Sequence, residues 1–232
     1  MIQGRCAMRL NIFNCSPRGR KSNTALLTEA FAEGFCANAE KTGSLKEEND
    51  FRHFFIAEQE DFRCAVEVFR EPSVALTAFP VYVDAMPGIA KEFIEAIAVY
   101  RGQCASTRMV FLIQSGFPEE THTRPMAAYL LKMAQRLGTP CDGVIRMGGG
   151  ESVRRRAESS GGRRLMRQYR RLGSRYASTG SLDEAILSGL AGPKRLPGAI
   201  VRLTLPLLNY LFWGTQLKRN DAYSGRFERP LM

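Results

Sequence analysis

A polar segment after the first apolar run of the chain combines the residue types that bind anions. The candidate binding residues in it carry hydroxyl, amide and guanidinium groups: Ser16, Ser22, Thr24, Asn23 and Arg18. Arg20 and Lys21 add further positive charge. A helical pattern follows directly, so these side chains, backbone N–H groups and a helix N-terminus are expected to converge on one point. The segment therefore predicts a site for the phosphate group of a nucleotide or cofactor.

The segment does not match the two glycine-based phosphate loops. Dinucleotide folds use G-x-G-x-x-G, but only Gly19 is present here. Mononucleotide loops use G-x-x-x-x-G-K-[ST]; Lys21-Ser22 matches the end of that pattern, whereas Cys15 and Arg20 occupy both glycine positions. The remaining interpretations are a loop that binds a terminal phosphate through side chains and an ordinary strand-to-helix turn capped by Ser22.

Two further loops follow predicted strands and carry aromatic residues. The carboxyl ends of parallel strands meet at one edge of a sheet, where such folds bind ligands. Both loops are therefore expected beside the polar segment. Their residues are Pro80, Val81, Tyr82 and Val83 in the first loop and Ser115, Gly116 and Phe117 in the second.

These three loops together resemble those of the flavodoxin-like NAD(P)H-dependent FMN reductases, over roughly residues 8–150. The resemblance rests on Ser-Pro-Arg…Asn-Thr, on Pro-x-Tyr and on the loop after the fourth strand. It implies FMN as cofactor, NADH or NADPH as co-substrate, and a small acceptor such as a quinone or a free flavin. The flavin then carries the redox chemistry, so no catalytic side chain is expected.

The same resemblance places the flavin ring against the two aromatic loops. Tyr82 and Phe117 are expected to stack on it, although both residues also suit an ordinary rim. Gly116 lets backbone N–H groups approach the reduced ring. Three charged residues follow, which either contact the ring edge or substrate or complement a helix N-terminus: Glu119, Glu120 and His122.

Alternating strand and helix patterns predict an α/β, flavodoxin-like three-layer sandwich with five parallel strands in the order 2-1-3-4-5. The strands are expected at Arg9–Asn14, Phe51–Ala57, Ser73–Phe79, Thr107–Ser115 and Val144–Met147. Helices are expected at Asn23–Glu40, Asp61–Phe69, from Pro87 onward and at His122–Leu137. We expect the FMN-binding domain to span residues 1–180 and a helical extension to span residues 181–232.

The charge and the cysteines restrict the class of protein further. The net charge is +10, yet residues 1–150 contain equal numbers of basic and acidic side chains, so the excess lies in residues 151–232. The six cysteines form no C-x-x-C pair, so no metal site is expected. Scattered cysteines and no recognisable signal peptide predict a cytoplasmic protein.

Residues 154–176 predict an amphipathic helix with an arginine-rich face. Leu165, Tyr169, Leu172 and Tyr176 recur on the opposite face. The arginines are either a solvated surface, a dock for nicotinamide phosphates, or a dock for an acidic partner. Nucleic-acid binding is not expected. The positive charge is compatible with it, but no motif that combines aromatic and basic residues supports it.

The almost wholly apolar segment Leu196–Trp213 is a further addition, interrupted by Arg202 and Pro206. It suits a helix packed on a twin subunit, a helix in a membrane interface or, least well, a membrane span. A homodimer is expected, because the resemblance implies a ring site completed by a second subunit.

Two other functions remain open from the sequence. A flavodoxin-type electron carrier would bind FMN without oxidising a nicotinamide, but such carriers are typically acidic and this chain is basic. A cofactor-free scaffold of the same fold would bind a membrane or an acidic partner through residues 151–232.

Overall fold

The computed structural model describes residues 8–37 and 50–228. Five parallel strands form one sheet in the order β2-β1-β3-β4-β5, which confirms the predicted topology. Val81 at the end of β3 pairs in register with Ser115 at the end of β4, so both strands end level with each other. The strands are β1 (Arg9–Asn14), β2 (Asp50–Phe55), β3 (Ser73–Val81), β4 (Thr107–Ser115) and β5 (Cys141–Met147).

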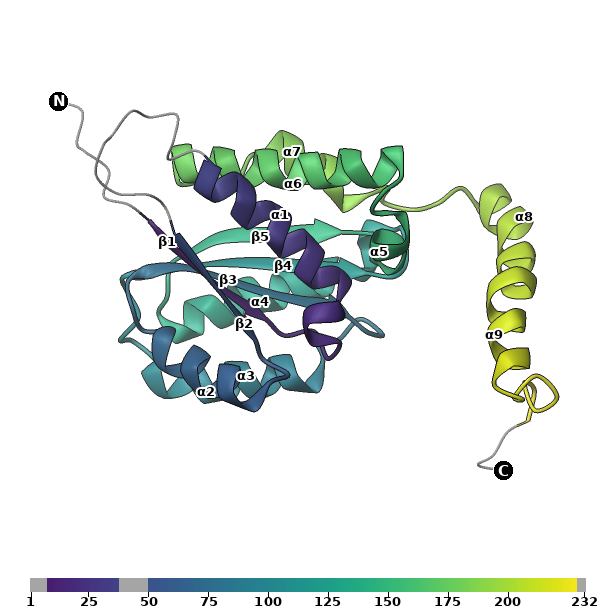
Figure 1. The fold of residues 1–232 in the computed structure, drawn as a ribbon, viewed down its shortest axis with the longest axis horizontal. Helices are drawn as coiled ribbons and strands as arrows, with labels where there is room; N and C mark the ends of the chain where they lie inside the picture. Colours follow the sequence, from purple (N-terminus) through teal and green to yellow (C-terminus); the bar gives the residue numbers. More distant parts are fainter. Residues whose placement is uncertain (1–7, 38–49, 229–232) are drawn as a thin grey trace. The chain divides into compact units, whose positions relative to one another are not determined.

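Helices cover both faces of the sheet, as Figure 1 shows: α1, α6 and α7 lie over one face and α2, α3 and α4 over the other. Each interface is a separate apolar core. β3 is buried along its whole length, as a central parallel strand must be. The helices are α1 (Asn23–Ala37), α2 (Gln59–Val68), α3 (Gly88–Ile97), α4 (Arg124–Leu137), α5 (Val153–Arg156), α6 (Ser160–Thr179) and α7 (Glu184–Ala191).

Helices α1 and α6 approach each other closely through two glycines. A Cβ atom at Gly34 would overlap the Arg170 carbonyl, and one at Gly173 would overlap the Phe31 carbonyl. The helix expected over residues 154–176 is divided into α5 and α6. Tyr169, Leu172 and Tyr176 are buried on α6 as predicted, whereas Leu165 is half-buried. This packing fixes the segment between β5 and α6, which forms part of the cavity described below.

Most element bounds agree with the sequence, and the exceptions have local causes. Pro87 precedes α3 as its N-cap rather than forming its first turn, because its ψ of 151° is extended. A 3-10 turn at Glu120–His122 delays α4 until Arg124. Gly138 ends α4 in the left-handed conformation, with φ 72°, as predicted. The expected end of the first helix at Glu40 lies outside the described residues.

The chain divides into two compact units after Lys194, later than the expected boundary at 180. The reason is α7, which packs on β5 and so belongs to the first unit. The second unit contains α8 (Gly198–Leu208), a π-helical turn (Asn209–Trp213) and α9 (Gly214–Arg219). Within residues 8–37 and 50–228, no helix combines the length and the apolar character that crossing a bilayer requires.

Candidate functional site

A cavity of about 510 Å³ opens at the carboxyl edge of the sheet, between the loops that follow β1, β3 and β4. All but two of the sequence-predicted binding residues line it: Ser16, Arg18, Asn23, Pro80, Val81, Tyr82, Val83, Ser115, Gly116 and Phe117. His122, considered from the sequence, also lines it. Three lining residues were not predicted: Asp84, Gln114 and Glu151.

The loop between β1 and α1 is organised by a buried side chain at the end of β1. Asn14 Oδ1 accepts a hydrogen bond from the Ser16 backbone N–H at 3.0 Å, and Asn14 Nδ2 donates to Ser22 Oγ at 3.3 Å. Ser22 Oγ in turn accepts from the Ala25 N–H at 3.0 Å, so Ser22 caps α1. Asn14, a polar side chain that is fully buried at the end of β1, thus fixes the shape of the loop between β1 and α1.

Two of the predicted binding side chains therefore do not line the cavity. Ser22 is occupied by its cap, and Thr24 is fully buried, with its Oγ1 accepting from Gln114 Nε2 at 3.5 Å. The backbone contributes instead: N–H groups in the first turn of a helix have no partner within that helix. With the N–H of Ala25 capped, those of Asn23 and Thr24 are the first-turn donors that remain for an anion.

Asn23 joins the loop to the segment that follows β5. Its Nδ2 donates to the carbonyls of Gly150 at 2.8 Å and Glu151 at 3.2 Å, and its Oδ1 accepts from the Arg154 N–H at 3.1 Å. The side-chain amide is thus used within the protein. Asn23 lines the cavity, but its structural contribution is to hold two chain segments together.

The two arginines of the loop are not equivalent. Arg20 binds both carboxylate oxygens of Glu58 at 2.8 Å and lies over the Phe55 ring at 4.3 Å, away from the cavity lining. Arg18 lines the cavity and forms an ion pair with Glu151 at 3.5 Å. Both partners of this pair are more than half exposed, so it is weak and a bound anion can compete for the guanidinium.

The loop after β3 forms a tight turn with unusual backbone conformations. Tyr82 and Ala85 exchange two backbone hydrogen bonds of 2.9 Å, and the two residues between them have positive φ, 47° at Val83 and 61° at Asp84. A β-branched residue in this region costs about 1–2 kcal/mol. Val83 is 99% exposed, so packing does not offset this strain. Such strain clusters at ligand sites.

The wall after β4 stacks an aromatic residue on a histidine. The Phe117 and His122 rings lie 4.6 Å apart and nearly parallel. His122 Nδ1 lies 3.3 Å from Asp84 Oδ1, and its Nε2 lies 3.5 Å from Glu119 Oε2. This cluster links the walls that follow β3 and β4. Sequence spacing placed His122 near the loop, but gave no signal for its pairing with Asp84.

Glycines near the cavity serve different purposes. A Cβ atom at Gly116 would meet nothing closer than the Glu151 Cβ at 3.9 Å, so the packing of the protein does not require glycine there. In contrast, a Cβ atom at Gly148 would overlap the Pro118 carbonyl, and one at Gly150 would overlap the Gln114 side chain. The glycine run after β5 is therefore needed for close packing around the cavity.

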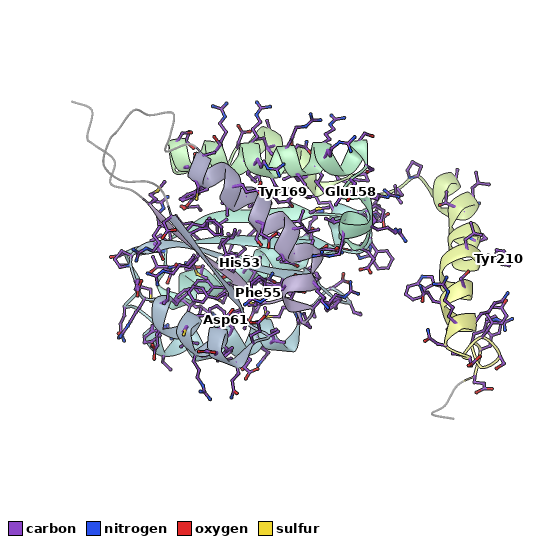
Figure 2. The ribbon with its side chains drawn as sticks, viewed as in Figure 1. His53, Phe55, Asp61, Glu158, Tyr169 and Tyr210 are labelled. Carbon is purple, nitrogen blue, oxygen red and sulfur yellow. The ribbon has the colours of Figure 1, made fainter. Side chains whose placement is uncertain are left out.

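Buried titratable groups beneath the loop are held uncharged. Burial raises the pKa of the Cys15 thiol, so it is protonated and not a nucleophile at neutral pH. Burial and the nearby Arg20 lower the pKa of His53 to about 4. Figure 2 shows His53 beside Phe55 on β2, and their rings stack at 4.2 Å. In the described part of the chain no cluster suitable for a metal ion occurs.

No protein-family model matches the chain, and neither does any curated protein sequence. Among solved structures, an apo NADH:FMN oxidoreductase is similar, with TM-score 0.57 and 15% identity, over 84% of this chain and 99% of that one. An oxidoreductase from Corynebacterium diphtheriae gives TM-score 0.54 and 14% identity, over 75% and 97%. An azoreductase from Bacillus anthracis gives TM-score 0.50 and 10% identity, over 73% and 98%.

The fold is flavodoxin-like. In flavodoxin-like sheets of order 2-1-3-4-5, ligands bind outside the carboxyl ends of the strands, at the switch point between β1 and β3. The cavity of this protein lies at that point, with the Ser16 loop after β1 and the Tyr82 loop after β3. The flavodoxin-like architecture and the lining residues thus identify the same edge.

Proposed function

We propose that the protein is an FMN-dependent oxidoreductase that oxidises NADH or NADPH and reduces a small acceptor such as a quinone or a free flavin. One observation carries the proposal: one cavity at the β1/β3 switch point is lined by the polar Ser16 loop, whose composition suits an anion, and by two loops that carry aromatic residues. The names of the similar structures, an NADH:FMN oxidoreductase and an azoreductase, support the same class of reaction.

The residues present fit FMN. The Ser16 hydroxyl, the first-turn N–H groups of α1 and the Arg18 guanidinium suit its phosphate. Tyr82 and Phe117, both partly exposed at the cavity, suit its ring. The cavity volume of about 510 Å³ lies within the range of roughly 300–1,000 Å³ that is usual for cofactor sites.

When bound, FMN would carry electrons from the nicotinamide to the acceptor. The protein would supply binding, orientation and electrostatics. The Phe117 N–H donates to Ser115 Oγ at 3.1 Å, which fixes the loop after β4. We assign the Gly116 N–H to the ring edge, where it stabilises negative charge. His122 lines the cavity beside Phe117, and we assign to it contact with the acceptor.

We also propose a homodimer that completes this site. Val83 is fully exposed at the cavity, and Tyr82 and Phe117 are 44% and 63% exposed. Apolar side chains grouped beside a cofactor site suit coverage by a second copy. Analytical ultracentrifugation with and without FMN tests this; a monomer under both conditions contradicts it.

Titration with FMN, followed by absorbance and by quenching of flavin fluorescence, tests the cofactor. We expect saturable binding, and then FMN-dependent oxidation of NADH or NADPH in a steady-state assay. Bound FMN without nicotinamide oxidation would instead identify an electron carrier. Absence of FMN binding would overturn the proposal and favour a cofactor-free scaffold.

A further inference from the structure

The second unit exposes large apolar side chains along one continuous helical run. α8, the π-helical turn and α9 follow one another from Gly198 to Arg219. Figure 2 shows Tyr210 projecting from this run. Four of its described apolar side chains are strongly exposed: Leu203 at 79%, Tyr210 at 68%, and Leu211 and Trp213 at 59% each. An exposed patch of this kind marks an interaction surface.

The charges around this helical run have one sign. No acidic residue occurs between Glu184 and Asp221. Five basic residues lie in the same interval, grouped at its ends and at one position between: Lys194, Arg195, Arg202, Lys218 and Arg219. The Lys218 ammonium lies 6.0 Å from the Tyr210 ring centre and 5.0 Å from that of Tyr223, so cations and aromatic rings share one region.

We propose that Gly198–Arg219 is an interfacial anchor that binds the surface of bilayers containing anionic phospholipids. Tyrosine and tryptophan favour the membrane–water interface, where their apolar rings are buried and their polar groups stay hydrated. Flanking lysine and arginine residues bind anionic headgroups. Arg202 and Pro206 within the run favour a position in the interface over one across the bilayer.

Charge favours a lipid surface over a second copy of the same segment. Pairing two copies would bring ten basic side chains together without an acidic one from this interval, and like charges repel. Anionic headgroups neutralise the same charges. The first unit carries its own cationic face on α6, where Arg164, Arg167 and Arg171 are exposed and Figure 2 shows nitrogen-tipped side chains along the helix. Net attraction to anionic surfaces is therefore distributed over the chain.

The single tryptophan makes the test direct, because all tryptophan emission comes from Trp213. The full-length protein is mixed with vesicles of phosphatidylcholine alone or with added phosphatidylglycerol. We expect a blue shift of emission and co-sedimentation only with phosphatidylglycerol, both weakened by high salt. Phosphatidylcholine brominated in its acyl chains, in the mixed vesicles, is expected to quench the emission.

Matched variants distinguish binding through the anchor from nonspecific adsorption of the protein to vesicles. Leu211→Glu places a charge on the exposed face of the anchor, whereas Leu131→Glu does so at a 48% exposed leucine of α4. We expect Leu211→Glu to abolish co-sedimentation and Leu131→Glu to leave it unchanged. Lys218→Gln is expected to weaken binding about fivefold, the equivalent of roughly 1 kcal/mol per basic residue at an anionic surface, and the exposed Lys132→Gln is expected to have no effect.

Three outcomes would overturn the anchor. Trp213 emission that does not change with either vesicle type contradicts the anchor. So does a blue shift that grows with protein concentration in the absence of lipid, which would identify a second copy as the occupant. Equal loss of binding in Leu131→Glu and Leu211→Glu would show that the apolar segment is not the contact. None of these readouts requires FMN, so the anchor and the proposed function stand or fall separately.

Discussion

The two ends of the cavity are built in different ways. At the end that we assign to the phosphate of FMN, here called the phosphate end, Asn14, Ser22 and Asn23 are buried and hydrogen-bonded to one another or to a neighbouring loop. At the ring end, Val83 and Phe117 are exposed, and the backbone at Val83 is strained. One end is therefore preorganised by the core of the domain, while the other leaves apolar surface for a ligand or a second subunit.

The largest expected effect comes from the residue that organises the phosphate end. Asn14→Ala removes two buried hydrogen bonds, leaving the Ser16 N–H and Ser22 Oγ without this partner. We expect a loss of about 3 kcal/mol in the free energy of unfolding and FMN affinity at least ~100-fold weaker. Urea denaturation and FMN titration measure both.

The control for Asn14 is another buried asparagine of the same strand. Asn11 Nδ2 donates to Ser73 Oγ at 3.0 Å, while its Oδ1 is buried without a partner among the described residues. Asn11→Ala is expected to leave FMN affinity unchanged. If it weakens FMN as strongly as Asn14→Ala, the phosphate end is not specifically organised by Asn14.

Acid is expected to destabilise the folded protein through His53, which lies within β2. The pKa of His53 falls from 6.5 to about 4 in the folded protein, so the unfolded chain binds more protons between these values. The stabilisation is complete above pH 6.5 and is lost as the pH falls toward 4, on the order of 3 kcal/mol in total.

Denaturant melts at a series of pH values measure this loss. His53→Gln is expected to flatten the profile between pH 6.5 and 4. His122→Gln, at the other histidine of the chain, is expected to retain it. A profile that depends on His122 rather than His53 would contradict the buried neutral imidazole.

Ser16 and Ser22 lie in the same loop, but their substitutions are expected to affect different properties, FMN affinity and stability respectively. Ser16 lines the cavity, so Ser16→Ala is expected to weaken FMN about tenfold, roughly the contribution of one hydrogen bond to a charged group. Ser22 caps α1, so Ser22→Ala is expected to cost about 1 kcal/mol of stability instead. Equal effects of both variants on FMN affinity would mean that the loop acts as one unit.

The smallest expected effect lies at the ring end. Val83→Gly relieves the positive φ at a residue that makes no packing contribution, and we expect a gain of about 1 kcal/mol, or roughly 2–4 °C in Tm. Val99, also exposed but with ordinary φ, is the control: Val99→Gly is expected to lower Tm. Thermal melts without FMN measure both changes in Tm. A fall in Tm for Val83→Gly, as for Val99→Gly, would contradict the backbone strain at Val83.

The sequence predicted the sheet well because apolar runs bounded by polar residues set strands such as β1 and β4 to the residue. It also located the three loops around the cavity. A cap of the helix by Ser22 is one of the alternatives left open from the sequence, and the structure has it. The burial of Thr24 was not predicted, because it depends on Gln114, a polar residue hidden within an apolar strand. Glu151 follows β5 and reaches the cavity only through the tertiary fold, so local patterns carry no signal for it. Asp84, in contrast, directly follows the predicted loop residue Val83.

We expect the preorganised phosphate end and the open aromatic end to bind FMN together and so to support nicotinamide oxidation. The most direct measurement is the absorbance of the FMN-loaded protein on anaerobic addition of NADH or NADPH. We expect the protein to retain FMN and the visible absorbance bands of the bound FMN to bleach with one of the two nicotinamides. Protein that retains no FMN, or bound FMN whose bands persist with both nicotinamides, would contradict it.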